Sequence, residues 1–213
     1  MSVKSNLGVQ RIIDLSLDVG MVPGAKFHYK WYEYAQWQVE ALKKVGLEPQ
    51  HKLLDIGCGP LRFGLLGIEY LDDGGYFGMD VFPPFIELGK ALYKESGLSK
   101  SYQVLEDANF EFSRFNNMFD YAMSQSVFTH LSKDQVERCL KNLKNVMNPG
   151  GQLLFTNIVS AAPRGFLYSS KQPMFTGVNM DETFYRGLCS SLEIEFVPHV
   201  MDHPTQHVHI IKF

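Results

Sequence analysis

The chain has 213 residues, of which 45% are hydrophobic and 20% are charged, and its formal net charge at pH 7 is −3. This length and composition predict one globular domain, or one domain with an appendage, and the small negative charge excludes a general basic field, so we expect no nucleic-acid partner. No stretch approaches the roughly 20 apolar residues of a membrane span, and residues 1–20 lack the apolar core of a signal peptide, so we expect a soluble, cytoplasmic protein without a membrane partner.

Short apolar runs alternate with segments of helical period along the chain, which indicates an α/β fold with a largely parallel sheet. In chain order, the elements predicted before residue 130 are a helix at 30–45, a strand at 52–57, a helix at 61–71, a strand at 76–81, a helix from Pro83 to the residue before Gly97, and strands at 101–107 and 119–125. The first helix carries Trp31, Ala35, Val39 and Leu42 on one face, as an amphipathic helix does.

The same alternation continues in the second half of the chain. Ser132 and Gln135 form a capping box ahead of a further helix. We expect the Pro-Gly-Gly run at 149–151 to end that helix and to lead into a strand at 152–156. Residues 158–180 are rich in Ser, Pro, Gly and aromatic residues, and this composition predicts a loop region.

Beyond this loop, Asn179 and Glu182 predict the capped start of a short helix that runs to Leu188. Residues 191–197 and 207–213 predict two final strands, and the connection between them is short enough for an antiparallel pair. The predicted fold class is therefore an α/β fold whose largely parallel sheet ends with an antiparallel strand pair.

Carboxylates recur where the predicted strands end, which is where open α/β sheets bind their ligands. Asp55 precedes the Gly-Cys-Gly turn at 57–59, Asp80 ends the second strand, and Asp107 ends the third. A carboxylate at the end of the second strand can accept both hydroxyls of a ribose. An NAD-binding G-x-G-x-x-G motif needs a third glycine where this chain has Arg62, so the pattern favours a nucleoside without a diphosphate.

With these features, the chain resembles the class I S-adenosylmethionine-dependent methyltransferases. The resemblance covers roughly residues 50–157 and is carried, in order, by LLDIGCG, GMDV, LEDA, FDYAMSQSVFTHL and NPGGQLLFT, while Leu61 replaces the third glycine of the usual D-x-G-x-G-x-G. It implies a Rossmann-like three-layer α/β sandwich with a mostly parallel seven-stranded sheet, an antiparallel C-terminal strand pair and an N-terminal helical lid. The implied division is a lid at residues 1–48 and an S-adenosylmethionine-binding domain at 49–213, with a substrate-pocket insertion at about 158–180.

The resemblance also implies contacts with the cofactor, residue by residue. Gly57 and Gly59 would approach its methionine part, with Asp55 helping to hold the ammonium group. Asp80 would accept from the ribose hydroxyls. The other implied contacts are Asp107 and the Ala108 amide at the adenine edge, Val81 and Phe82 at the adenine face, Ser124, Gln125 and Ser126 beneath the sulfonium, and Tyr29, Tyr32 and Arg62 at the carboxylate.

His130 follows the fourth predicted strand, on the rim toward which the methyl group should point. We interpret it as a catalytic base or as a group that orients the acceptor, and the alternative is a histidine that caps the next helix or packs the loop. The predicted function is methyl transfer to a small molecule or short peptide, with oxygen slightly favoured over nitrogen because His130 is the obvious base nearby. A non-catalytic nucleoside-binding module of the same fold and, less favoured, an NAD-dependent oxidoreductase stay open, as does the oligomeric state.

Three C-terminal histidines raise the question of a metal site. His207 and His209 fall on the same face of a strand, but neither they nor His203 have a carboxylate or cysteine at a recognisable zinc spacing. The three cysteines form no C-x-x-C pair, and methyl transfer needs no metal. We therefore expect no metal and reduced thiols, with the histidines at the substrate mouth or on a solvated edge strand.

Overall fold

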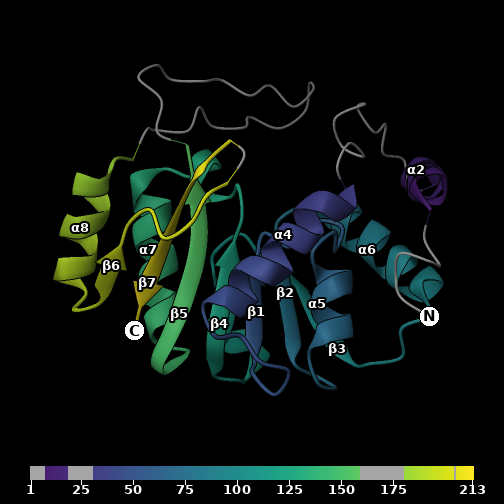
Figure 1. The fold of residues 1–213 in the computed structure, drawn as a ribbon, viewed down its shortest axis with the longest axis horizontal. Coiled ribbons are helices and arrows are strands. Elements are labelled where there is room, and N and C mark those ends of the chain that lie inside the picture. The colour runs from purple at the N-terminus through teal and green to yellow at the C-terminus, as the bar shows by residue number, and fades with distance from the viewer. Residues whose placement is uncertain (1–7, 19–30, 159–179, 204) are drawn as a thin grey trace. The chain divides into compact units, whose positions relative to one another are not determined.

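A computed structural model describes residues 8–18, 31–158, 180–203 and 205–213 (Figure 1). The chain divides into two compact units, residues 1–108 and 109–213. The seven strands follow the order β3-β2-β1-β4-β5-β7-β6, and β7 runs antiparallel to both of its neighbours. This is the Rossmann-like α/β fold with a mixed seven-stranded sheet that the sequence predicts.

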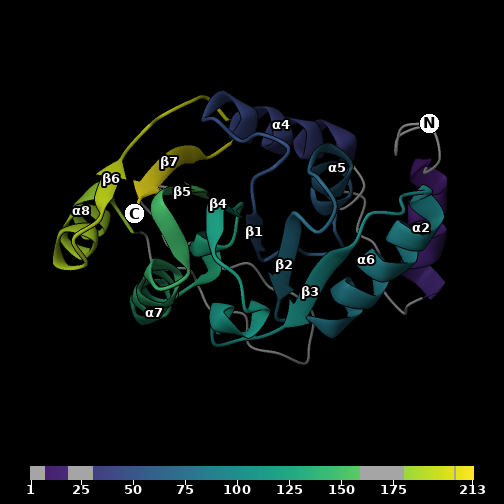
Figure 2. The same cartoon turned by 90° about the horizontal axis from the view of Figure 1, so that it is seen from below.

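The first unit supplies three parallel strands and four described helices. They are α2 (Val9–Asp18), α4 (Trp31–Lys44), β1 (Leu53–Ile56), α5 (Gly64–Tyr70), β2 (Tyr76–Asp80), α6 (Pro83–Ser96) and β3 (Tyr102–Glu106). Every residue of β1 and β2 is buried, which is why both strands read as continuous apolar runs. Helices α5 and α6 contact β2, while α4 packs on α5 and α2 on α6 (Figure 2).

Helix boundaries in this unit follow local chemistry. Two prolines open α6, and Gly97 ends it in the left-handed conformation with φ 78°, as predicted. The buried face of α4 includes Gln38 and Ala41, whereas Val39 is only partly buried, so the predicted apolar stripe is wrong at Val39. Helix α2 was not predicted, and the ion pair between its Arg11 and Glu95 of α6, at 2.5 Å, joins segments far apart in sequence.

The second unit contains four strands, two α-helices and two short 3₁₀ helices among its described residues. They are η1 (Phe112–Phe115), β4 (Phe119–Ser124), η2 (Phe128–His130), α7 (Lys133–Lys144), β5 (Met147–Asn157), α8 (Glu182–Ser191), β6 (Glu195–Val197) and β7 (His207–Lys212). Phe155 of β5 packs against Tyr185 of α8 with ring centroids 4.9 Å apart, and Tyr185 stacks on Phe196 of β6 at 5.5 Å. Aromatic packing thus covers this end of the sheet.

The predicted capping box of α7 is present. The Ser132 hydroxyl accepts from the Gln135 amide, and the Gln135 side chain accepts from the Ser132 amide at 2.8 Å. The cap predicted for α8 is wrong, because Asp181 rather than Asn179 accepts from the Phe184 amide, at 3.0 Å. Asn179 itself lies outside the described residues.

The Pro-Gly-Gly run at 149–151 lies inside β5 and does not end α7, so that prediction is also wrong. The pairing of β4 with β5 shifts register at this point, which makes the run a bulge. Gly150 has φ 81° and donates to the Phe213 carbonyl at 2.9 Å, so the C-terminal residue holds the bulge in place.

Strand β7 lies between β5 and β6 rather than at an edge of the sheet. His209 is fully buried in it, with its ring 5.2 Å from that of Phe155. The expectation that the C-terminal histidines line a substrate mouth or solvate an edge strand is therefore wrong for His209, because β6 pairs with β7 and places β7 inside the sheet.

Candidate cofactor site

The turn after β1 has the backbone shape that its glycines allow. Gly57 and Gly59 have φ 72° and 54°, in the left-handed region that favours glycine. The amides of Gly57 and Cys58 donate to the Met79 carbonyl at 2.7 and 3.0 Å, which ties the turn to the end of β2. A Cβ placed on Gly59 would meet no described atom within 4 Å, so a ligand can approach the backbone there.

Asp80 ends β2, and backbone amides hold its carboxylate in a fixed orientation. One oxygen accepts from the Gly59 amide at 2.8 Å and the other from the Phe82 amide at 2.9 Å. Burial raises the pKa of Asp80, and these amide hydrogen bonds partly offset the effect. Each carboxylate oxygen keeps a second lone pair, so the oriented group can still accept from a pair of ligand hydroxyls.

Apolar and polar groups at the ends of β2 and β3 lie beside this carboxylate. The Asp107 amide donates to the Asp80 carbonyl at 3.0 Å, so the segment after β3 meets the end of β2. Val81 is 63% exposed and Phe82 37% exposed, although both are large and apolar. Ala108 is exposed as well. An exposed apolar pair next to a fixed carboxylate suits a flat aromatic base attached to a ribose.

Asp55 is buried, with 2% of its surface exposed, and it accepts from the Tyr76 hydroxyl at 2.6 Å. Burial raises the pKa of Asp55 to about 7; the Tyr76 hydrogen bond and the nearby Arg62 lower it, and Asp80 raises it. The carboxyl group is therefore close to its titration midpoint at neutral pH. Tyr76 was not among the predicted site residues, because an aromatic residue that opens a buried strand reads as core.

Arg62 is half-buried and contacts helix α4. Its guanidinium carbon is 5.4 Å from the centre of the Tyr34 ring, a cation–π contact. Burial lowers the pKa of Arg62, while Tyr34 and Asp55 raise it. Tyr34 was missed by the sequence analysis, which named Tyr32 and Tyr29 instead. Tyr29 lies outside the described residues, and Tyr32 is partly buried with its pKa raised by burial.

The position of the buried face of α4 explains why Tyr34 was missed. With about 100° per residue, Tyr34 lies next to the buried face of α4 that includes Trp31 and Gln38, whereas Tyr32 lies about 100° away from that face. A helical wheel centred on the predicted face of Trp31, Ala35, Val39 and Leu42 places Tyr32 nearer to that face than Tyr34, so the sequence pattern did not point to Tyr34.

Leu61, at the third glycine position of the motif, keeps the backbone conformation of a glycine, with φ 58°. This left-handed residue delays the start of α5 to Gly64, three residues later than predicted. The Leu61 side chain is buried against two glycines: a Cβ on Gly64 would lie 2.7 Å from its Cδ2, and a Cβ on Gly89 of α6 would lie 2.9 Å from its Cγ. These glycines make room for the leucine.

Gly89→Ala tests this packing. The added methyl group has no space beside Leu61 and the Pro60 backbone, so we expect the free energy of unfolding to fall by about 1–3 kcal/mol, although alanine favours helix. Gly187→Ala is the matched control, since a Cβ on Gly187 of α8 meets no described atom within 4 Å; it should stabilise the protein by up to about 1 kcal/mol. Urea unfolding measures both, and equal stabilities of the two variants would contradict the packing argument.

The second unit carries the other predicted residues, after β4. Ser124 is fully buried, and its hydroxyl and the Gln125 side-chain oxygen have no hydrogen-bond partner among the described residues. Ser126 has φ 57°, and its amide donates to the Thr156 hydroxyl at 2.8 Å. Because buried polar atoms normally have partners, these two suit a polar ligand at the end of β4.

His130 is the last residue of η2, and its amide donates to the Val127 carbonyl at 2.8 Å. The side chain is half-buried, and burial lowers the pKa of His130. A lowered pKa keeps the imidazole neutral at pH 7, the form in which it can accept a proton.

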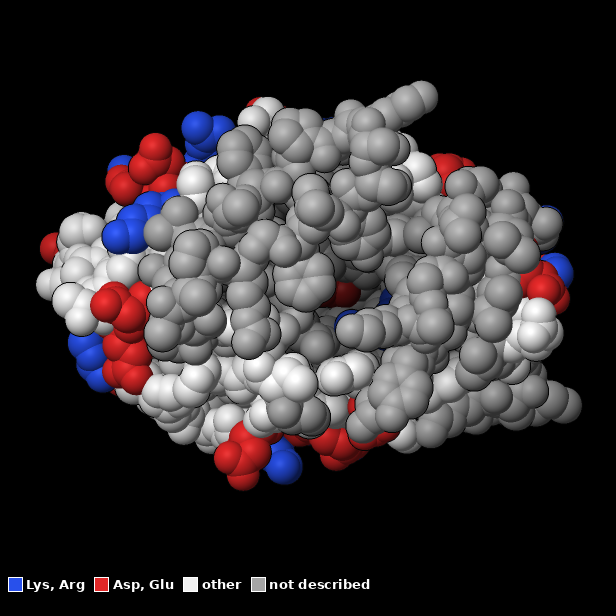
Figure 3. All heavy atoms as spheres, turned by 90° about the horizontal axis from the view of Figure 1, so that it is seen from above, with Lys and Arg blue, Asp and Glu red and all other residues white. Residues whose placement is uncertain are grey.

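In the described part of the chain, no group of three or more His, Cys, Asp or Glu side chains is placed to hold a metal ion. None of the described helices is both long enough and apolar enough to cross a membrane. In Figure 3 the described acidic and basic side chains lie interspersed on the face shown, without a continuous field of one sign.

Residues 53–151 match the family model described as a methyltransferase domain. The fold is similar to magnesium protoporphyrin IX methyltransferase of Synechocystis PCC 6803 with bound S-adenosylhomocysteine (TM-score 0.66, 9% identity, 94% of this chain and 93% of that chain). It is also similar to an S-adenosylmethionine-dependent methyltransferase of Clostridium acetobutylicum ATCC 824 (TM-score 0.65, 11% identity, 86% of this chain and 92% of that chain). A third similar structure is the N-methyltransferase NodS of Bradyrhizobium japonicum WM9 (TM-score 0.59, 18% identity, 86% of this chain and 95% of that chain). Residues 53–151 therefore form a methyltransferase domain, and the structures to which the fold is similar are S-adenosylmethionine-dependent methyltransferases.

Proposed function

We propose that this methyltransferase binds S-adenosylmethionine through the residues at the ends of β1, β2 and β3 and methylates a small molecule or short peptide. One observation carries the assignment of the binding residues. The Asp80 carboxylate is fixed by two backbone amides beside the open backbone of Gly59 and the exposed pair Val81 and Phe82. This is the arrangement that a nucleoside requires.

The nucleoside half of the cofactor meets the ends of β2 and β3. Asp80 accepts hydrogen bonds from the ribose hydroxyls. Val81 and Phe82 pack on the faces of the adenine ring, and Asp107 and the Ala108 amide meet its polar edge. The Asp107 amide already bonds to the Asp80 carbonyl, which supports placing the ribose and adenine contacts side by side.

The methionine half meets the turn at 57–59. Its amino acid group carries one positive and one negative charge, and the buried Asp55 and the half-buried Arg62 offer one charge of each sign. Asp55 holds the ammonium group and Arg62 the carboxylate, while Tyr34 keeps Arg62 in place from α4. Helix α4 therefore contributes to the binding site, which supports the proposed lid at residues 1–48, with Tyr32 and Tyr29 as further contacts.

The bound cofactor supplies a methyl carbon activated by its positively charged sulfur. The protein contributes alignment and the exclusion of water. Ser124 and Gln125 have unpartnered buried polar atoms, which support the contact with the cofactor that the family resemblance implies for them. His130, as a base or as a group that orients the acceptor, slightly favours oxygen as the acceptor atom. Nitrogen is the second candidate for the acceptor atom, and one protein of similar fold is named as an N-methyltransferase. The formal net charge of −3 supports a small acceptor over a nucleic acid.

Calorimetric titration with S-adenosylmethionine, S-adenosylhomocysteine and NAD tests the binding residues and the activity. We expect binding of the first two and none of NAD, followed by transfer of a radiolabelled methyl group to members of a panel of hydroxyl, carboxyl and amine acceptors. Binding of NAD alone would overturn the assignment. Binding of both adenosyl compounds without transfer to any acceptor class would favour the non-catalytic nucleoside-binding module.

A further inference from the structure

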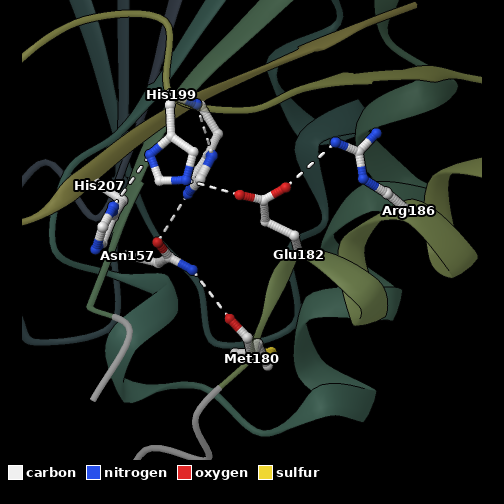
Figure 4. A network of polar contacts seen from close by, with 7 residues as sticks. Asn157, Met180, Glu182, Arg186, His199 and His207 are labelled. Atoms are coloured by element: carbon white, nitrogen blue, oxygen red, sulfur yellow. Dashed lines mark hydrogen bonds and ion pairs between the residues drawn. The ribbon is translucent and has the colours of Figure 1, made fainter. Parts of the chain in front are cut away.

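A chain of three ionisable side chains lies at the C-terminal end of the second unit (Figure 4). Glu182 belongs to the first turn of α8, His199 to the connection between β6 and β7, and His207 is the first residue of β7. The His199 Nε2 atom lies 2.7 Å from a Glu182 carboxylate oxygen, and its Nδ1 atom lies 3.1 Å from Nδ1 of His207. Segments from three elements therefore converge on one hydrogen-bonded line.

The carboxylate determines where the protons in this line sit. Partial burial raises the pKa of Glu182, but hydrogen bonds from His199 and Arg186 outweigh it and leave the pKa below the usual value. An ionised carboxylate only accepts, so His199 carries its proton on Nε2. The Nδ1 atom of neutral His199 then accepts from Nδ1–H of His207. The Nε2 atom of His207 is left with a lone pair, and it has no hydrogen bond to any residue in the described ranges.

Neighbouring groups hold His199 in position. Its backbone has φ 50°, and its amide donates to Nδ1 of His209 at 3.3 Å. The other ring nitrogen of His209 lies 2.9 Å from the Asn157 side-chain oxygen, and Asn157 in turn donates to the Met180 carbonyl at 3.0 Å. Burial lowers the pKa of His209 to about 4, with lesser effects from His199, Glu182 and His207, so its ring stays neutral.

This line ends at the edge of the sheet where α/β enzymes bind their substrates. His207 pairs with Asn157, the last residue of β5, so it lies at the carboxyl edge of that strand. The preceding residue, Gln206, donates from its side chain to the hydroxyl of Ser126, just after β4. The segment at 124–126 is the one proposed to lie beneath the sulfonium. His207 is therefore next to that segment within the same unit.

We propose that Glu182, His199 and His207 form a proton relay, in which Nε2 of His207 accepts the proton that the methyl acceptor releases, while His130 orients the acceptor. This inference rests on the proposed methyl transfer. A lone pair of the acceptor oxygen or nitrogen forms the bond to the methyl carbon, the carbon–sulfur electron pair remains on sulfur, and the acceptor proton moves to Nε2 of His207. His207 is the catalytic residue, while His199 and Glu182 position it and offset the positive charge that it gains.

The charged and titratable side chains that face His207 in this network are those of His199 and His209, with Glu182 and Arg186 from α8. Arg186 pairs with Glu182 at 3.2 Å and keeps the carboxylate ionised. Protonation of His199 would reverse the direction of the hydrogen bond between His199 and His207. Protonated His199 donates from both ring nitrogens, so Nδ1 of His207 would accept and His207 would carry its proton on Nε2. The two states differ in the tautomer of His207, which can be measured without any ligand.

Long-range ¹H–¹⁵N spectra of the imidazole rings test the relay at about pH 8.5, well above the ordinary histidine pKa. We expect His207 as the Nδ1–H tautomer. His51 is the internal control, because its Nδ1 accepts from the Glu48 amide at 2.9 Å and its proton must therefore sit on Nε2. Finding His207 as the Nε2–H tautomer would overturn the relay.

Variants connect the tautomer to the reaction. Glu182→Ala should shift His207 toward the Nε2–H tautomer, whereas Glu195→Ala, which removes only the ion pair with Lys212, should leave it unchanged. With an acceptor from the hydroxyl panel, His207→Ala should slow methyl transfer by about 10²–10⁴-fold and leave the calorimetric affinity for S-adenosylmethionine unchanged. Unchanged transfer by His207→Ala across neutral pH would overturn the role as base.

Failure of the relay and failure of the proposed function give different results. A wild-type protein that does not bind S-adenosylmethionine contradicts the proposed function whatever the tautomer of His207 is. A protein that binds the cofactor and transfers the methyl group, but shows His207 as Nε2–H, contradicts only the relay.

Discussion

Asp80→Ala should lower the affinity for S-adenosylmethionine by about 10²–10⁴-fold, because each hydrogen bond from a ribose hydroxyl to a charged acceptor contributes about 1.5–3 kcal/mol. The carboxylate also accepts from the amides of Gly59 and Phe82, so its removal leaves two backbone donors without their partner. Isothermal calorimetry measures the affinity, and circular dichroism at the same temperature establishes that the variant is folded.

Asp80→Asn separates the charge that the side chain offers to the ribose hydroxyls from the hydrogen bonds that it accepts from the amides of Gly59 and Phe82. Asparagine keeps the size and one acceptor oxygen, so we expect an affinity between those of the wild type and Asp80→Ala. Asp72→Ala is the matched control, since Asp72 is exposed in the turn before β2. Folded Asp80 variants with wild-type affinity would show that the ribose binds elsewhere.

Local sequence rules predicted the features that depend on a few adjacent residues. The capping box of Ser132 and Gln135 and the glycine end of α6 are confirmed, because each is built within one helical turn. The mostly parallel seven-stranded sheet with an antiparallel C-terminal strand pair, which the family resemblance implied, is confirmed as well.

The errors occur where distant segments decide the local structure. The Pro-Gly-Gly run reads as a turn, but hydrogen bonds with the end of the chain hold it as a bulge in β5. The sequence suggests that His209, like His207, lies at a substrate mouth or on a solvated edge strand. In the structure His209 is buried, because β6 pairs with its strand and places it inside the sheet. The hydrogen bond from Tyr76 to Asp55 joins residues 21 positions apart, and no local sequence pattern predicts it.

The departure of Leu61 from the glycine motif illustrates a third case. A leucine in the left-handed conformation is costly by itself, and the sequence alone gives no reason for it. The structure supplies one, because Gly64 and Gly89 leave space in which the buried side chain packs. The third glycine of the motif can thus be replaced when glycines elsewhere take over the close approach.

Binding of S-adenosylmethionine should be about five-fold weaker at about pH 6 than at pH 7, and at pH 6 it should release about 0.9 proton. The pKa of Asp55 is raised by burial to about 7, so the unliganded carboxyl is mostly protonated at the lower pH. An ammonium group bound beside it favours the ionised form and lowers its pKa, which requires loss of the proton. The cofactor amino group stays charged over this range, since its ordinary pKa is about 7.7–8.0.

Titrations in two buffers with different ionisation enthalpies give the number of protons released, and Asp55→Asn should abolish the release. Without ligand the sign for stability is the opposite of the usual carboxylate: the folded state binds more protons than the unfolded state between about pH 4 and 7, so the contribution of Asp55 to stability decreases as the pH rises through this window. Asp55→Asn should therefore flatten both the binding and the stability profiles. If it flattens stability alone, Asp55 is a buried structural acid and the ammonium group binds elsewhere, because only direct contact with the cofactor couples its proton to both equilibria.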